Sequence, residues 1–272
     1  MPASAQDPPA IGNGYTLETL LGSGPLGRVW RAKAPGGVPV AIKQIGRYPS
    51  EELLQRERDI LLRLRDLRHV FLASLQAFWV EDHSLYLVTE LAEYNLRGLA
   101  DECQQVGKGG IPLALVLGYV RDAAEALDFL HRRRARHGNL KPENLLIFDA
   151  HVKVADCGSG ELLATVDMFD AHPRSAALPY YMAPEVIRGE PCGHSDQYSL
   201  AMIYAEARLN RPLFDTRDFM QLILAIMESR VFPDLESLSR LEQSVIRKAT
   251  DQNPKMRYAN CSEFVQALTA AI

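Results

Sequence analysis

The hydrophobic pattern of the chain changes period near Leu96, and this change restricts the possible folds more than any other feature. Over residues 15–91, short β-branched and aromatic runs alternate with Gly and Pro: YTLETLLG, RVWRAKA, VPVAIKQI and SLYLVTEL. Such runs predict an antiparallel sheet. Beyond Leu96, apolar residues recur at helical spacing in LALVLGYVRDAAEALDFLH, SLAMIYAEARL, FMQLILAIMES, LSRLEQSVIRKAT and CSEFVQALTAAI. We therefore expect an α+β fold, with a flexible lead-in over residues 1–14, a small β lobe over about 15–91 and a larger, mainly helical lobe over about 92–272.

One helix interrupts the predicted sheet, in the stretch SEELLQRERDILLRLRDL, with Ser50 as its N-cap. Its apolar face contains an acid, Glu57. The residues on this face are Leu53, Leu54, Glu57, Leu61 and Leu64. An acid at the edge of an apolar stripe is one interpretation. The other is an inward carboxylate, which would need a cationic partner.

The composition is that of an ordinary globular protein, with 47% hydrophobic residues, 24% charged residues and a formal charge of -4 over 272 residues. Neither nucleic acid nor an anionic membrane is indicated as a partner. The sequence contains no signal peptide and no run of about 18 apolar residues that could span a bilayer, so we expect no membrane insertion by this segment and a cytoplasmic location. The four cysteines are scattered, without a CxxC pair or a histidine at zinc-ligand spacing, and indicate no metal site.

A glycine-rich stretch, GSGPLGRV at residues 22–29, lies between two predicted strands. At a hairpin tip, backbone amides without side chains can fold over phosphates. A plain turn is the alternative. Further along, Lys43 interrupts the apolar strand VAIK; it is either solvent-facing or paired with Glu57 and aimed at a phosphate.

The stretch HGNLKPENLL at residues 137–146 contains Lys141 and Asn144, and the later stretch VKVADCGSG contains Asp156 after a short strand. An amide oxygen and a carboxylate are suitable Mg²⁺ ligands when the ion shares phosphate oxygens. Each residue alone could equally be a cap or a turn former. Their order behind Lys43 and Glu57 favours a site for ATP with Mg²⁺.

Taken together, these motifs resemble those of the protein kinase family, most closely the bacterial Ser/Thr kinases. The chain contains, in family order, GxGxxGxV, VAIK, an inward helix Glu, HxNxKPEN, DCG, APE, SDQYSL and NPKMR. The resemblance implies a two-lobed fold that binds ATP and Mg²⁺, with Asn144 and Asp156 as metal ligands. It implies a nucleotide-binding set of Gly22, Gly24, Gly27, Val29, Ala41, Lys43, Glu57, Thr89, Glu90 and Ala92.

The same resemblance gives some residues a narrower role. Thr89 would be the gatekeeper, and residues 90–92 the hinge that meets adenine. Glu185 and Arg257 would form a buried ion pair, and Asp196 would anchor the backbone of the catalytic loop.

Four positions depart from the family pattern. Asn139 replaces the catalytic Asp, which costs about 10²–10⁴ in rate, the usual worth of a general base. Gly138 replaces the loop Arg that receives an activation-loop phosphate. Leu178 replaces a Thr whose hydroxyl contacts the catalytic Asp, and Cys157 replaces the Phe of DFG.

These departures leave three functions open. The first is a pseudokinase that binds ATP with Mg²⁺ and regulates or docks a protein partner. The second is a slow but active Ser/Thr kinase in which Lys141 follows the transferred γ-phosphate. The third is an interaction scaffold that binds no nucleotide. The sequence names neither the partner nor the substrate.

Overall fold

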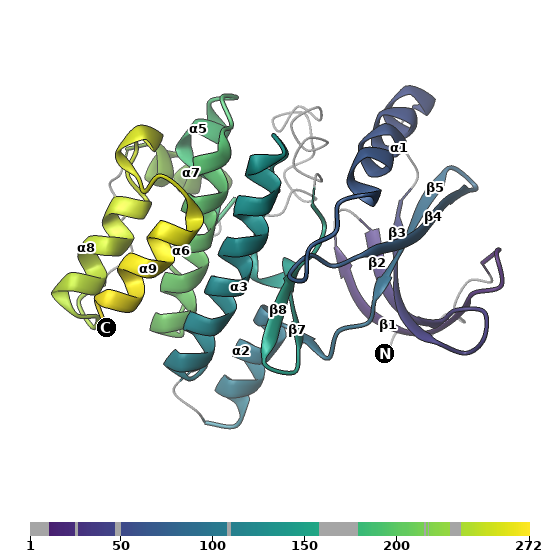
Figure 1. Cartoon of the computed structure of the whole chain (residues 1–272), viewed down its shortest axis with the longest axis horizontal. Coiled ribbons are helices and arrows are strands. Elements are labelled where there is room, and N and C mark those ends of the chain that lie inside the picture. Colours follow the sequence, from purple (N-terminus) through teal and green to yellow (C-terminus); the bar gives the residue numbers. More distant parts are fainter. Residues whose placement is uncertain are drawn as a thin grey trace. The chain divides into compact units, whose positions relative to one another are not determined.

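Five antiparallel strands and one helix form the first of two structural units (Figure 1). The computed structural model describes residues 11–24, 27–46, 50–107, 110–157, 179–214, 216, 218–228 and 235–272. The first unit comprises Met1–Leu67 and Ala73–Ala92. Its elements are β1 (Thr16–Gly24), β2 (Gly27–Lys33), β3 (Pro39–Ile45), α1 (Glu51–Arg65), β4 (Leu75–Glu81) and β5 (Ser84–Glu90). The strand order is β1-β2-β3-β5-β4, so the expected antiparallel sheet with one helix is confirmed.

The sheet buries apolar side chains on both faces, because side chains alternate along each strand. One face is covered by a cluster that includes Trp30, Ile42 and Val88. On the other face, Leu54 and Leu61 of α1 pack with Leu85 and Leu87 of β5. Leu54 and Leu61 are seven positions apart, which is two helical turns, so they lie on one side of α1 as expected.

The second unit comprises Arg68–Leu72 and Glu93–Ile272, and it is mainly helical. Its strands are β6 (Tyr94–Asn95), β7 (Leu145–Phe148) and β8 (His151–Val154), which form a three-stranded sheet. Its helices are α2 (Leu96–Gln105), α3 (Leu113–Arg132), η1 (Pro142–Asn144), α5 (Pro184–Ile187), α6 (Gly193–Leu209), α7 (Phe219–Glu228), α8 (Arg240–Ala249), η2 (Pro254–Met256) and α9 (Cys261–Ala270). None of the described helices is both long and apolar enough to cross a bilayer.

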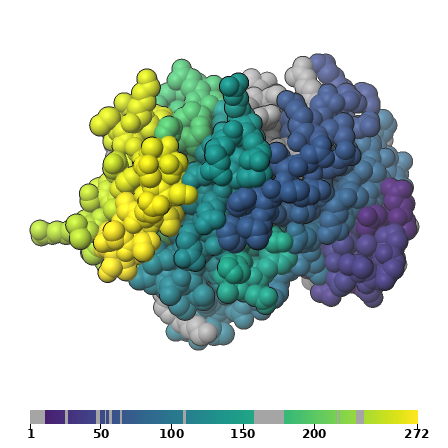
Figure 2. All heavy atoms as spheres, viewed as in Figure 1, coloured from purple at the N-terminus to yellow at the C-terminus, as the bar shows by residue number. Residues whose placement is uncertain are grey.

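Helices α3, α6 and α9 pack on one another at the core of the second unit (Figure 1). Residues 195–205 of α6 are all buried, which confirms that the stretch SLAMIYAEA belongs to a central helix. Helix α9 starts at an Asn260 cap, whose side chain accepts a hydrogen bond from the Glu263 amide at 2.8 Å. Figure 2 shows the atoms of α9 in yellow against those of α3 in teal.

Candidate functional site

In the first unit, one face of the sheet carries four of the residues expected to meet a nucleotide. Val29 of β2 lies opposite Lys43 of β3, and Ala41 of β3 lies opposite Thr89 of β5. Directly opposed residues of an antiparallel pair point to the same face, and so do residues two apart on one strand. Val29, Ala41, Lys43 and Thr89 therefore share a face, opposite that of the buried Ile42.

The three glycines of the hairpin differ in what the fold requires of them. Gly27 has φ +130°, and a Cβ there would lie 2.0 Å from the Gln44 carbonyl oxygen. Only glycine fits at that position. A Cβ at Gly22 or Gly24 would meet no described atom within 4 Å. The packing of the described residues thus explains the glycine at position 27 but not those at positions 22 and 24; positions 25 and 26 lie outside the described residues.

The remaining residues expected in the first unit are placed only in part. Glu57 lies in α1 between Leu54 and Leu61, but its side chain is outside what the structure describes, so its ion pair with Lys43 stays a prediction. The Glu90 carboxylate accepts a hydrogen bond from the Ser74 amide at 3.2 Å.

In the second unit, Asp196 of α6 holds the backbone of the loop over residues 137–144. Its two carboxylate oxygens accept hydrogen bonds from the amides of His137 at 3.0 Å and Gly138 at 2.9 Å. The expected anchoring contact is confirmed. Burial favours the neutral acid, but bonds from His131 and from the loop amides outweigh it and hold the pKa of Asp196 below its ordinary value. The anchor is therefore a carboxylate at neutral pH.

His137 connects this loop to the segment that precedes Asp156. The Asn139 amide donates to its Nδ1 at 3.2 Å, so Nε2 carries the hydrogen and donates to the Ala155 carbonyl at 2.7 Å. The side chain is fully buried. The imidazole is thus a structural bridge and not an exposed acid or base.

Asn144 is the second bridge within the loop. Its side-chain Nδ2 donates to the Asn139 carbonyl at 2.9 Å, and its own carbonyl accepts from the Ala155 amide at 2.9 Å. Because the amide nitrogen is used in this way, Oδ1 is the atom left for an external cation. Asp156 follows Ala155 directly with φ 59°, a left-handed conformation that Asp tolerates better than most residues.

Two polar side chains of the loop are available to a ligand. Within the part of the chain that the structure describes, neither the Asn139 amide group nor the Lys141 ammonium has a hydrogen-bond or ion-pair partner. An amide in this position can hydrogen-bond a hydroxyl but cannot take its proton. The loop thus offers a cation and a neutral hydrogen-bonding group.

The other departures from the kinase pattern have different outcomes. Gly138 has φ 76°, where a side chain costs about 1–2 kcal/mol, so glycine suits the backbone at this point. Leu178 lies outside the described residues. Desolvation, together with the charges of Asp156 and Asp196, raises the pKa of the Cys157 thiol to about 12. A thiol that stays protonated at neutral pH is a poor nucleophile.

Two ion pairs, one buried and one half-buried, complete the surroundings of the loop. Arg257 donates two parallel hydrogen bonds of 2.8 Å to Glu185, which confirms the expected pair. The second pair was missed from the sequence: Arg97 of α2 donates to Glu206 of α6 at 2.6 Å and lies 3.5 Å from Glu143 of the loop. The signal in the sequence was Glu206 itself, an acid within the apolar stretch SLAMIYAEA.

This architecture, a five-stranded antiparallel sheet with one helix followed by a helical unit with an anchored loop, defines a two-lobed protein kinase fold. The protein kinase domain matches residues 15–268, and the chain belongs to that family. The kinase domain of Mycobacterium tuberculosis PknI superposes with a TM-score of 0.75 at 22% identity, covering 96% of this chain and 99% of that one. A likeness at this identity supports the fold alone.

Curated relatives give the same family. Serine/threonine-protein kinase ULK3 of Homo sapiens is 28% identical over 262 residues, which cover 92% of this chain and 53% of the human protein. Its counterpart in Rattus norvegicus is 28% identical over 257 residues, 90% of this chain and 52% of the rat protein. The chain spans about half the length of the curated relatives it matches.

Proposed function

We propose that this chain is a pseudokinase domain, which binds ATP with Mg²⁺ and has lost most of its phosphoryl transfer. The observation that carries the nucleotide half of the proposal is the bond from Asn144 Nδ2 to the Asn139 carbonyl. This bond orients the side chain of Asn144, a suitable metal ligand, and its acceptor belongs to Asn139, the residue that replaces the catalytic base. The loop keeps Asn144 and Lys141, the side chains that would contact metal and phosphate. It lacks the carboxylate that would accept the proton of the incoming hydroxyl.

The nucleotide half of the proposal rests on groups that fit ATP and Mg²⁺. A Cβ at Gly22 or Gly24 would meet no described atom within 4 Å, which leaves space beside the hairpin for phosphates, and Lys43 shares a sheet face with Ala41 and Thr89. Oδ1 of Asn144 and the Asp156 carboxylate are the hard oxygen ligands that Mg²⁺ prefers. When bound, ATP with Mg²⁺ supplies a γ-phosphoryl group whose charge the metal partly neutralises.

The loss of transfer rests on three positions. Asn139 can position a hydroxyl but cannot deprotonate it. Gly138 offers no cation for a phosphorylated activation loop, and Leu178 has no hydroxyl to donate. With transfer impaired, the nucleotide-bound domain serves to regulate or dock a partner, and a protein is the partner class that a Ser/Thr protein kinase fold recognises.

Thermal unfolding tests the nucleotide half. We expect ATP with Mg²⁺ to raise the melting temperature more than either alone, because a ligand at about 100 times its Kd adds about 2.7 kcal/mol of stability. Lys43→Ala should remove the response to ATP, and Asp156→Ala only the extra response to Mg²⁺. No shift in the wild type at millimolar ATP would favour the scaffold and refute nucleotide binding.

A slow, active Ser/Thr kinase is the second candidate, and the Lys141 ammonium, which has no partner among the residues that the structure describes, favours it. Radiolabel transferred from ATP to the chain or to a generic protein substrate, above the level of a Lys43→Ala control, would support this candidate. If the wild type incorporates no more radiolabel than the Lys43→Ala control, the active-kinase candidate is refuted and the pseudokinase proposal stands.

A further inference from the structure

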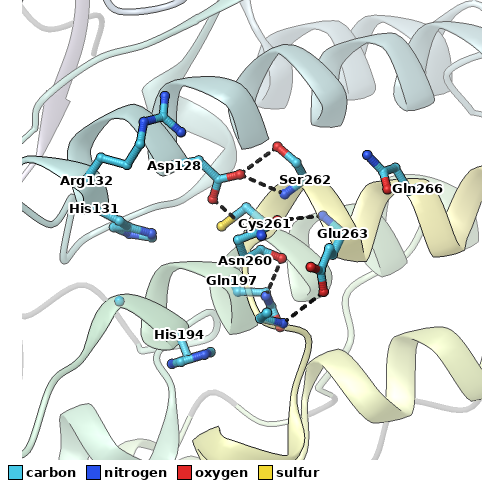
Figure 3. Close-up of a pocket in the computed structure, with 12 residues that line it drawn as sticks. Asp128, His131, Arg132, His194, Gln197, Asn260, Cys261, Ser262, Glu263 and Gln266 are labelled. Carbon is cyan, nitrogen blue, oxygen red and sulfur yellow. Dashed lines mark hydrogen bonds between the residues drawn. The ribbon is translucent and has the colours of Figure 1, made fainter.

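The second unit has a cavity between α3, α6 and the start of α9 (Figure 3). Its volume is about 650 Å³, and Asp128, His131, His194, Gln197, Cys261 and Glu263 are among the residues that line it. None of these residues belongs to the proposed nucleotide set. The proposed nucleotide site therefore does not explain this cavity.

Three side chains at this cavity bring together the donor types that zinc prefers. One ligand atom each of Asp128, His131 and Cys261 lies within 4.8 Å of the other two. A carboxylate oxygen, an imidazole nitrogen and a thiolate sulfur all bind Zn²⁺, with bonds of about 2.0–2.3 Å. Tetrahedral ligands of one such ion lie about 3.3–3.7 Å apart, so the three ligand atoms would have to approach one another by no more than about 1.5 Å to close the site.

The imidazole of His131 is already oriented by a carboxylate, as in protein zinc sites. Its Nε2 lies 2.8 Å from Oδ2 of Asp196, which is 2% exposed. This hydrogen bond occupies Nε2, so Nδ1 is the ring nitrogen left for a metal. A metal-binding histidine almost always donates its other N–H to a carboxylate or carbonyl in this way.

The other two ligands are held at the start of α9. Asp128 accepts hydrogen bonds from the amides of Cys261 at 2.9 Å and Ser262 at 3.0 Å, and from the Ser262 hydroxyl at 2.6 Å. These bonds fix the carboxylate next to Cys261, as the close-up shows (Figure 3). Asp128 is 7% exposed and Cys261 1%, so the donors are shielded on the protein side while the cavity gives an entry path.

We propose that Asp128, His131 and Cys261 form a Zn²⁺ site with its fourth position open to the cavity. On binding, the Cys261 S–H bond breaks, its proton leaves to solvent and a zinc–sulfur bond forms, with no change of oxidation state. Three protein ligands with one open position are typical of zinc that also takes water or a small ligand. The ion would join α3 to α9 and, through His131 and Asp196, to the anchored loop.

Cobalt substitution tests this site directly, because Co²⁺ occupies zinc sites and absorbs in the near ultraviolet when a thiolate binds it. The protein is used without a histidine tag and without nucleotide. We expect one equivalent of Co²⁺ to give thiolate–cobalt absorption, and one equivalent of Zn²⁺ to abolish it. A metal at Asn144 and Asp156 has no sulfur ligand, so this signal is independent of the nucleotide proposal.

The variants are chosen to separate the site from the other cysteines. Cys261→Ser should lose the absorption, whereas Cys103→Ser, at a buried cysteine of α2, should keep it. Asp128→Asn should weaken cobalt binding at least tenfold while keeping an oxygen to accept from α9. Wild-type protein without the absorption at excess cobalt, or Cys261→Ser protein that retains it, would overturn the proposal, and the wild-type measurement decides even if Cys261→Ser does not fold.

Discussion

The side-chain amide of Asn144 donates a hydrogen bond to the backbone carbonyl of Asn139 at 2.9 Å. Because the acceptor is a backbone atom, a change of side chain at position 139 leaves the bond in place. The Asn139 side chain itself has no hydrogen bond to any described residue. Structure at the loop and chemistry at position 139 can therefore be altered separately.

We first predict that Asn139→Asp raises phosphoryl transfer without changing stability. A carboxylate there can accept the hydroxyl proton, and general base catalysis contributes about 10²–10⁴ in rate. The measurement is label transfer under single-turnover conditions, beside thermal unfolding of both proteins. Asn139→Ala is the matched control and should be no faster than the wild type. An Asn139→Asp protein as slow as Asn139→Ala would mean that Gly138 and Leu178 limit the reaction.

Asn144→Ala should reduce both stability and Mg²⁺ dependence. The change removes the donor to the half-buried Asn139 carbonyl, which costs about 0.5–1.5 kcal/mol, and removes the Oδ1 that would bind the metal. Urea unfolding measures the first effect, and the Mg²⁺-dependent part of the ATP-induced melting shift measures the second. Asn144→Asp is a useful partner variant, since it keeps a metal ligand and loses the N–H donor. If Asn144→Asp failed to respond to Mg²⁺ as well, the metal role of this position would be refuted.

We expect Gly27 of the hairpin to be needed for stability, and Gly22 and Gly24 to be needed for ATP binding. Gly27→Ala should lower the free energy of unfolding by about 1–3 kcal/mol, because its Cβ meets the Gln44 carbonyl and its φ is +130°. Gly22→Ala should change stability by less than about 0.5 kcal/mol, yet weaken ATP binding. Calorimetric titration of ATP into each folded variant separates the two effects. Equal ATP affinity in the wild type and in Gly22→Ala would make the hairpin a plain turn.

The Glu185–Arg257 pair should make stability depend on pH in acid. Burial by itself raises the pKa of Glu185, but the bonds from Arg257 and Ser195 outweigh burial and hold it below its ordinary value of 4.5. The unfolded chain therefore binds this proton more readily. The stabilisation is complete above pH 4.5 and is lost as the pH falls through the folded-state pKa.

Glu185→Gln isolates this contribution from that of other acids. At neutral pH it should cost about 3–5 kcal/mol, because the buried Arg257 keeps its charge and loses its partner. The difference in unfolding free energy from the wild type should shrink as the pH is lowered, since protonated Glu185 resembles Gln. Urea unfolding at a series of pH values checks this. A difference that stays constant down to pH 3 would contradict the assigned pKa direction.

Much of the architecture follows from local sequence patterns. The alternation in VPVAIKQI and SLYLVTEL predicts strands whose two faces are both used, and β3 and β5 pair accordingly. Ser50 before Glu51 predicts the first turn of α1, and the nearly all-apolar SLAMIYAEA predicts the central helix α6. Strand alternation, helical periodicity and capping depend on neighbours a few residues apart, so the sequence displays them directly. The kinase-like order of motifs can likewise be recognised from the sequence alone.

The long-range side-chain contacts of the second unit could not be predicted from local sequence patterns. Asp128 and Cys261 are 133 positions apart, and Arg97 and Glu206 are 109 apart. The cysteine spacing indicated no metal site, because the spacing rules for zinc ligands cover residues close in sequence, whereas the proposed ligands come from two helices that are distant in the chain. Sequence by itself determined which elements form, their order and the missing base at Asn139. Only the packing of α3, α6 and α9 decided which polar side chains share a buried space, because helix packing depends on the combined shape of distant side chains.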